Sequence, residues 1–167
     1  MSSTNDPVPD AWKAGKLPYG PSITLATAKK MLDAAEAEAR KQELLMVIAI
    51  TDAGGNLVAF NRMDNAMLLS VHIAIDKAFT AVCGKVPTEI WRSILQAGIL
   101  PPLFIHDRLT PISGGLPLVK DGKLIGGLGV SGATALGDTT VARASLVAGE
   151  CSTKDIDAII VELKKLQ

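Results

Sequence analysis

Residues 115–134 read GLPLVKDGKLIGGLGVSGAT and contain the clearest structural signal in the chain. Two aliphatic runs flank an Asp-Gly pair, and this arrangement is a strong signal for a tight β-hairpin. We therefore predict strands over residues 115–119 and 124–130. Small residues follow the second strand, and helical character begins soon afterwards, so we expect a helix over residues 136–149.

The first half of the chain repeats this hairpin pattern. Residues 44–50 and 57–62 read as strands around the turn TDAGGN, whose two glycines are free to take positive φ. Apolar periodicity predicts a helix over residues 25–39 with Thr24 as its cap, and further helices over residues 70–84 and 87–98. A last helix is expected to begin near Ser152, with Asp155 as its capping-box partner. Hairpin-paired strands with helices between them indicate an α+β fold built on an antiparallel sheet.

Composition narrows the class of protein further. The chain has 167 residues, of which 48% are hydrophobic and 20% charged, as expected for a globular protein. Seventeen basic residues balance seventeen acidic ones, and only 4% are aromatic, so nucleic-acid binding is excluded. A net charge of zero favours self-association. Without a signal peptide or membrane-length apolar run, a cytoplasmic protein with no membrane contact is expected.

The N-terminal region differs from the rest of the chain. Residues 1–22 contain four prolines together with Trp12 and Tyr19, which indicates an extended arm lying on its own domain or on a neighbouring subunit. Residues 23–167 are expected to form a single domain. Cys83 and Cys151 lie far apart in the sequence and are interpreted as two reduced core thiols.

The glycine-rich stretch that ends the second hairpin is the first candidate site. Its strand runs into Ser131 and Gly132 just before a predicted helix, where backbone N–H groups favour an anion. The same glycines would also allow a helix to pack closely on the sheet, and both interpretations remain open.

The predicted helix over residues 70–84 is the second candidate. Helical geometry places Ser70 and Lys77 along nearly the same line, with Thr80 about 60° further round and away from the apolar face. On the other flank, His72 and Asp76 are four residues apart and can pair. A solvated helix edge explains the same residues equally well.

A third candidate lies between the predicted helix over residues 87–98 and the second hairpin. His106 stands beside Asp107 and Arg108, shortly before Gly114 and Gly115. His72 and His106 are the chain's two histidines, and histidine is the usual acid, base or metal ligand near neutral pH. A loop histidine that only donates and accepts hydrogen bonds is the simpler alternative.

Two acidic residues on the first predicted helix could hold iron. Asp33 and Glu36 have a D-x-x-E spacing that offers oxygen ligands on one helix face. Pairing with Lys29 and Arg40, each four residues away, accounts for them equally as surface ion pairs.

The sequence resembles the GlcG/HbpS family of haem-binding and haem-degrading domains over residues 23–149. The resemblance is carried by TDAGGNL at 51–57, IAIDKAFTA at 73–81, PT at 87–88, GGLPL at 114–118, DGKLIG at 121–126 and GVSGAT at 129–134 before Asp138. It implies a profilin-like fold, in which helices flank a central antiparallel sheet, and homo-oligomers from dimers to octamers. It also implies haem or iron binding in some members and, through the YGP motif at 19–21, a branch associated with aromatic-compound catabolism.

Three functions follow as hypotheses. The first is binding of haem or another planar or carboxylate anion, with iron held by His72 or His106 and a propionate near Lys77 and Ser131. The second is a small hydrolase, tautomerase or lyase acting on a carboxylate-bearing intermediate of aromatic catabolism. There, Arg62 or Arg108 would bind the carboxylate, Lys77 or His106 would move the proton with Ser70 nearby, and the amides of Gly114–Gly115 or Ser131–Gly132 would hold an oxyanion. The third is a non-catalytic accessory oligomer.

Overall fold

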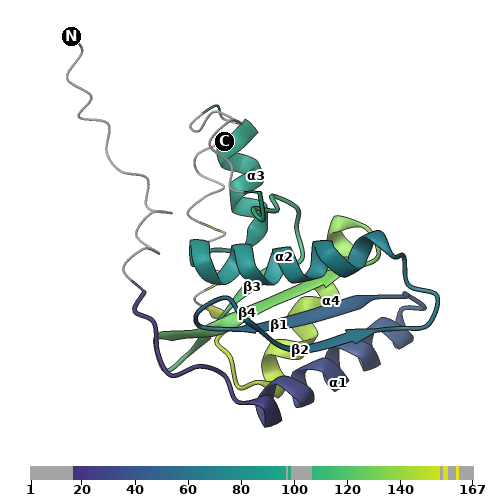
Figure 1. Ribbon diagram of the computed structural model, residues 1–167, viewed down its shortest axis with the longest axis horizontal. Helices are drawn as coiled ribbons and strands as arrows, with labels where there is room; N and C mark the ends of the chain where they lie inside the picture. Colours follow the sequence, from purple (N-terminus) through teal and green to yellow (C-terminus); the bar gives the residue numbers. More distant parts are fainter. Residues whose placement is uncertain (1–16, 97, 99–106, 155, 158–160, 162–167) are drawn as a thin grey trace.

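The computed structural model describes residues 17–96, 98, 107–154, 156–157 and 161. Within these residues the chain forms a four-stranded sheet covered by helices on both faces (Figure 1). The elements are α1 Leu25–Lys41, β1 Val47–Asp52, β2 Leu57–Arg62, α2 Leu69–Gly84, α3 Thr88–Gln96, β3 Gly115–Lys120, β4 Lys123–Ser131 and α4 Ala135–Ala148. The predicted α+β fold is confirmed.

The sheet is antiparallel, with strand order β2-β1-β4-β3. Both predicted hairpins are present, and the second closes through Asp121 and Gly122, whose φ angles are 50° and 68°. Positive φ at both central residues is the geometry that matches the twist of paired strands. The local Asp-Gly signal therefore set the register of β3 against β4.

The first predicted strand begins three residues later than expected. Residues 42–44 close α1 instead of joining the sheet, because the amides of Gln42, Glu43 and Leu44 donate to the carbonyls of Glu38, Arg40 and Ala39, respectively. Helix ends leave carbonyls without intrahelical partners, and this segment satisfies three of them. β1 consequently starts at Val47 and extends to Asp52.

Alternate residues of β1 face two different layers. Ile48 and Ile50 are fully buried in the core under α1 and α4, whereas Val47 and Ala49 are buried under α2. Figure 1 shows α2 along one side of the sheet and α1 with α4 along the other. The sheet is thus the middle layer of three, and α2 is the main cover of one face.

Two glycines of β4 allow α2 to approach the sheet closely. A Cβ added at Gly127 would lie 2.1 Å from the carbonyl oxygen of Ala78, and one at Gly129 would lie 2.0 Å from that of Ala74. Backbone-to-backbone approach of this kind leaves no room for a side chain. At these two positions the structure supports the interpretation that the glycines serve helix packing.

The described end of the N-terminal region contacts its own domain. Tyr19 forms a parallel bridge with Leu124, and the amide of Gly20 donates to the Leu124 carbonyl at 2.8 Å. The Tyr19 ring also lies under the Lys85 ammonium group, 4.3 Å from its centroid. Residues 17–20 therefore pair with the start of β4 in their own domain.

The C-terminal predictions are only partly covered. Asp155 and most of the predicted last helix lie outside the described residues, although Ile156 is fully buried. Both cysteines are unbridged, with Cys151 buried and Cys83 exposed, so Cys83 is not the core thiol we expected. Among the described residues, we find no helix whose length and hydropathy would let it span a bilayer.

Candidate functional site

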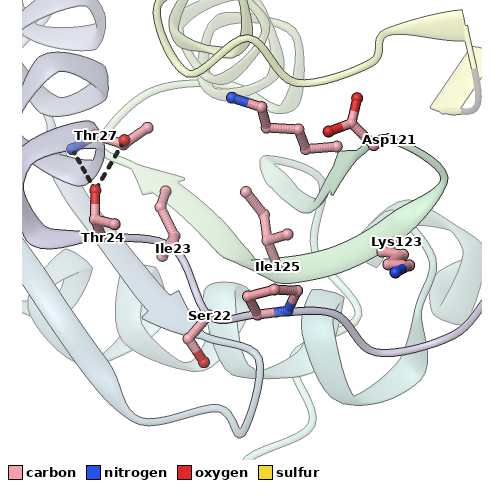
Figure 2. A pocket seen from close by; sticks show the side chains of 9 residues that line it. Ser22, Ile23, Thr24, Thr27, Asp121, Lys123 and Ile125 are labelled. Atoms are coloured by element: carbon pink, nitrogen blue, oxygen red, sulfur yellow. Dashed lines mark hydrogen bonds between the residues drawn. The ribbon is translucent and has the colours of Figure 1, made fainter.

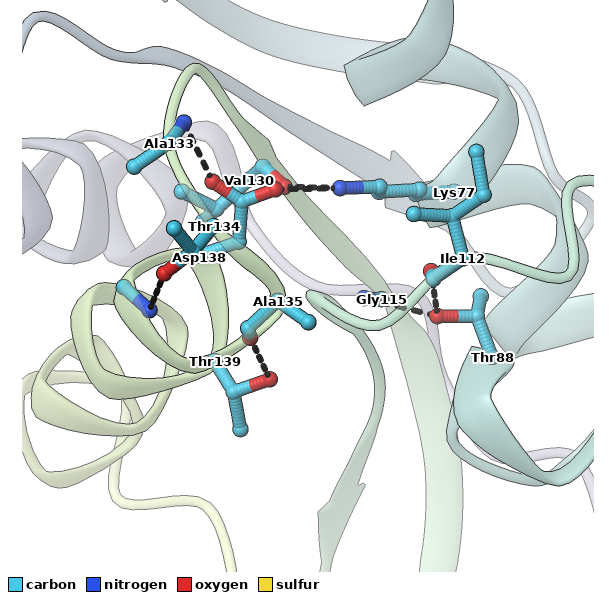
Figure 3. A network of polar contacts seen from close by, with 11 residues as sticks. Lys77, Thr88, Ile112, Gly115, Val130, Ala133, Thr134, Ala135, Asp138 and Thr139 are labelled. Carbon is cyan, nitrogen blue, oxygen red and sulfur yellow. Dashed lines mark hydrogen bonds and ion pairs between the residues drawn. The ribbon is translucent and has the colours of Figure 1, made fainter.

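Lys77 forms the centre of a buried polar network beneath α2. Its side chain is 1% exposed, and Nζ donates to Asp138 Oδ2 at 2.6 Å and to the Val130 carbonyl at 2.8 Å (Figure 3). Burial lowers the pKa of Lys77, while the hydrogen bond and negative charge of Asp138 oppose that shift. The ammonium group thus joins α2 to the end of β4 and the start of α4.

The other residues predicted on this flank of α2 are also buried. Ser70 is 1% exposed and Thr80 is 3% exposed, so a solvated helix edge is wrong for them and for Lys77. Thr80 Oγ1 donates to the Arg108 carbonyl at 3.1 Å and accepts from the Thr110 amide at 2.9 Å. Thr80 therefore holds residues 108–110 against α2.

The start of α4 is capped by the chain's own side chains. Asp138 Oδ1 accepts from the Ala133 amide at 2.9 Å, and Thr134 Oγ1 accepts from the Gly137 amide at 3.2 Å. We expected an external anion, such as a propionate, at this helix start beside Lys77. The Asp138 carboxylate occupies that role instead, because it meets both the helix N-terminus and the ammonium group.

Gly114 and Gly115 lie next to this network but serve packing. The Gly115 amide donates to Thr88 Oγ1 at 3.0 Å, and a Cβ at Gly115 would lie 2.7 Å from the Lys77 carbonyl oxygen. Gly114 has a φ of +108°, and its carbonyl accepts from the Val130 amide at 2.9 Å. The Gly115 amide is therefore already bonded within the fold, where we expected it to face an oxyanion.

Ser131 and Gly132 are similarly enclosed. Ser131 is 5% exposed at the end of β4, where it pairs with Val47. Gly132 has a φ of +154°, and a Cβ there would lie 2.4 Å from the Leu45 carbonyl oxygen. Both residues shape the turn from β4 into α4 and lie against the chain that precedes β1.

Arg108 is anchored on the outer side of α2. Its Nε donates to Asp76 Oδ1 at 3.0 Å, and its guanidinium carbon lies 3.9 Å from the centroid of the Phe79 ring. Asp76 therefore pairs with Arg108, and the predicted pairing of Asp76 with His72 is wrong. With 39% of its side chain exposed, Arg108 remains at the surface.

The opposite flank of α2 presents a different arrangement. α2 lies over β1, β4 and β3, whereas β2 is an edge strand whose residues are only partly buried. Phe60 on β2, with Val71 and Ile75 on α2, packs against the buried cluster at this edge and stays partly exposed. The fold thus leaves apolar side chains partly exposed at the β2 edge of the sheet, which α2 does not fully cover.

Two of the predicted site residues lie beside these apolar side chains. Arg62 is opposite Val47 in the sheet register, so it shares the face that α2 covers, and it is exposed. His72 is exposed and adjacent in sequence to Val71, with Ile75 one helical turn further on. We call this set the β2–α2 corner: Phe60, Arg62, Val71, His72 and Ile75.

The metal predictions have an uneven outcome. His106 lies outside the described residues. Glu36 accepts from Arg40 at 2.7 Å and from Asn61 Nδ2 at 3.2 Å, as expected for an ion-paired helix surface. Within the part of the chain that the structure describes, no three His, Cys, Asp or Glu side chains form a metal-binding group.

Sequence reasoning missed Asp138 as the partner of Lys77. The two residues are 61 positions apart, and they meet only because the fold brings the end of β4 and the start of α4 to Lys77 on α2. One signal was available, because Asp138 falls in the first turn of a predicted helix that follows a serine–glycine turn. An acidic residue in the first turn faces the positive end of the helix dipole. Its carboxylate can also pair with a positive charge, either an external cation or a buried lysine.

The chain is a three-layer α+β domain in which α2 packs on glycines of β4, and these features define its structural class. The chain belongs to the HbpS-like family, described as haem degrading proteins, whose model matches residues 23–147. It is 39% identical over 128 residues to an uncharacterized 15.0 kDa protein of the dhaT-dhaS intergenic region of Citrobacter freundii, covering 75% of this chain and 90% of that protein. It is 36% identical over 108 residues to the protein GlcG of Escherichia coli strain K12, covering 62% and 77%.

Solved structures share the fold. The Klebsiella pneumoniae protein ORFY superposes with a TM-score of 0.75 at 33% identity, covering 78% of this chain and 92% of that one. PduOC, whose structure was solved as a complex with haem, superposes with a TM-score of 0.73 at 30% identity, covering 79% and 98%. These structural matches agree with the family assignment and with the antiparallel sheet.

Proposed function

We propose that the protein binds haem, or another planar molecule that carries carboxylates, at the β2–α2 corner. The observation behind this proposal is an exposed imidazole, that of His72, on the helix whose partly exposed apolar side chains pack with Phe60, while the exposed Arg62 lies on the sheet face that this helix covers. Histidine nitrogen is a common ligand of haem iron, apolar side chains suit a porphyrin face, and arginine suits a propionate. The residue types present therefore fit the group.

Each residue has a distinct part in this proposal. His72 would coordinate the iron, Phe60 and Ile75 would contact the planar ring, and Arg62 would bind a carboxylate. Bound haem would supply an iron centre for redox or oxygen chemistry. The solved complex of the related PduOC with haem supports the ligand class.

Two alternatives from the sequence receive different support. His106 remains a second proposed iron ligand and is included in the experiment. Catalysis at Lys77 finds no support in the geometry, because Nζ is enclosed in an ion pair and bonded to a carbonyl. No contact described above favours the hydrolase, tautomerase or lyase hypothesis over binding.

We also infer that copies of this chain associate with each other. Met67, Leu68 and Leu69 are consecutive in sequence and 58%, 72% and 71% exposed. Contiguous exposed apolar side chains commonly mark an interaction surface. The formal net charge of zero leaves little repulsion between copies.

The binding proposal predicts a saturable hemin titration. The purified protein should give a shifted Soret band at one hemin per subunit. His72→Ala should remove the shift and weaken binding by at least about tenfold, or about 1.4 kcal/mol, because the iron loses its protein ligand. Arg62→Gln should weaken binding while leaving the Soret position unchanged, because only a carboxylate contact is lost.

Matched variants separate this site from others. Lys30 is an exposed residue of α1, in the layer on the opposite face of the sheet. The Lys30→Ala variant should therefore give the same hemin titration as the parent protein. Loss of the shift in His106→Ala with a normal His72→Ala would move the iron ligand to His106 and overturn the assignment of the corner. A weak response that never saturates in the folded parent protein would overturn haem binding itself.

A further inference from the structure

A cavity of about 340 Å³ lies where the N-terminal segment, the start of α1 and the β3–β4 turn meet (Figure 2). Its volume falls within the range typical of small-molecule sites, about 300 to 1,000 Å³. The register of β4 places this cavity at the opposite end of the sheet from Arg62 and the β2–α2 corner. Its lining comes from two segments, one between residues 21 and 27 and the other between residues 120 and 125.

The cavity has an apolar floor. Ile23 and Ile125 lie side by side there in Figure 2 and are only 7% and 8% exposed. Their backbones are joined, since the Ile23 amide donates to the Ile125 carbonyl at 2.8 Å. Pro21 adds a third apolar side chain to the lining. A floor held by a backbone hydrogen bond is preorganised to contact the apolar body of a ligand.

The rim of the cavity is positively charged and polar. Lys120 and Lys123 contribute two positive charges and Asp121 one negative charge, so the lining carries a net charge of +1. Hydroxyl groups of Thr24 and Thr27, 3.0 Å apart, lie on the side across from Asp121 and Lys123. The first turn of α1 holds no acidic residue to offset the lysines.

The Lys120 ammonium group has an exchangeable partner. Its Nζ lies 2.6 Å from Glu150 Oε2, and the side chains are 38% and 77% exposed. Exposed ion pairs of this kind contribute little to stability, so another carboxylate can replace Glu150 at little cost. Glu150 does not line the cavity. Its carboxylate would therefore compete, from outside the cavity, with a bound ligand for the Lys120 ammonium group.

We propose that this cavity binds a small organic carboxylate with an apolar ring or chain. The apolar body rests on Ile23 and Ile125, and the carboxylate meets Lys120 in place of Glu150. The Thr24 and Thr27 hydroxyls, on the opposite wall, offer hydrogen bonds to a polar substituent. This site is separate from the corner proposed for haem, so either proposal can fail without the other.

The test uses benzoate as the probe, with inorganic phosphate and benzyl alcohol for comparison. Benzoate at millimolar concentration should shift the backbone amide NMR signals of Ile23, Thr24 and Ile125 in a saturable way. Phosphate lacks the apolar body and benzyl alcohol lacks the charge, so each should bind more weakly. Unchanged amide signals with benzoate, or equal shifts with phosphate, would overturn the proposal.

Two variants should act in opposite directions. Lys120→Gln should weaken benzoate binding by about three- to tenfold, because it removes the charged partner of the carboxylate. Glu150→Gln should strengthen binding by about two- to fivefold, because it removes the competitor. Lys41→Gln, at the far end of α1, is the matched control and should not alter binding. A weaker affinity in Glu150→Gln would contradict the exchange.

Discussion

At the scale of single residues, Lys77 and Asp138 form an ion pair that is buried on both sides. Their side chains are 1% and 4% exposed, so neither charge can be solvated by water if the other is removed. Asp138 also accepts the Ala133 amide through its second oxygen. The pair therefore couples the packing of α2 to the start of α4, and we expect its main contribution to be to stability.

Replacing Lys77 by methionine tests this role. Lys77→Met fills similar space but leaves the Asp138 carboxylate buried without its counter-charge, which should lower the free energy of unfolding by about 3 to 5 kcal/mol. Urea denaturation followed by circular dichroism measures the change. The exposed Lys30→Met variant should stay within about 0.5 kcal/mol of the parent protein.

A second substitution shows whether the loss comes from the uncompensated charge. Asp138→Asn keeps an oxygen for the Ala133 amide but removes the negative charge. The double variant should therefore lose less stability than the two single losses added together, giving a favourable coupling in the double-mutant cycle. Strict additivity of the two losses would contradict a direct interaction.

At the scale of secondary-structure elements, the contact between β4 and α2 determines how the layers fit. Gly127 and Gly129 lie on one face of β4 and meet carbonyl groups of α2. Gly115, opposite Gly129 on β3, meets the Lys77 carbonyl in the same way. This row of glycines lets α2 lie close enough for Lys77 to reach the Val130 carbonyl.

Gly129→Ala tests the need for this close approach. The new Cβ would lie 2.0 Å from the Ala74 carbonyl oxygen and 2.6 Å from the Ala78 amide nitrogen, both of which are backbone atoms. We expect α2 to be displaced and the free energy of unfolding to fall by about 1 to 3 kcal/mol or more. Thermal and urea denaturation measure the loss.

Gly137→Ala is the matched control for that substitution. Its Cβ would meet only side-chain atoms, the nearest at 3.0 Å, and the position is helical. Alanine is the better helix former by about 1 kcal/mol, so this variant should be near neutral or stabilised. Equal losses in both variants would contradict the packing argument.

Local signals explain why the elements could be predicted from the sequence. The Asp121-Gly122 turn and the Thr24 cap each depend on residues that are close in sequence, and the structure contains both. The predicted start of β1 was wrong because the amides of residues 42–44 donate to carbonyl groups at the end of α1. Strand propensity takes no account of these unpaired carbonyl groups.

The candidate site was harder to predict because its contacts are distant in sequence. Helical periodicity placed Lys77 away from the expected apolar face of α2, whereas the structure buries Lys77 together with Ala74 and Ala78. Periodicity could not reveal that β4 and α4 bury that flank, since burial depends on Asp138 and Val130. The cavity bounded by Ile23 and Ile125 has the same origin, because segments about one hundred residues apart form it.

At the scale of the whole molecule, exposed apolar surface remains after the core is complete. Met67, Leu68 and Leu69 lie before and at the start of α2, close in sequence to His72. Because they are exposed in a single chain, burying them against a second copy would contribute about 25 cal/mol per Å² of apolar area. Self-association is therefore expected to involve this end of α2.

The double variant Leu68→Glu with Leu69→Glu tests this surface. Size-exclusion chromatography with light scattering should give a mass above 17.5 kDa for the parent protein and close to 17.5 kDa for the variant. The reason is that two carboxylates per chain would have to be desolvated in the contact. Val147→Glu, 77% exposed on α4 in the opposite layer, should leave the oligomer intact. If Val147→Glu dissociates the oligomer and the double variant does not, the contact between copies lies on α4 and not at the start of α2.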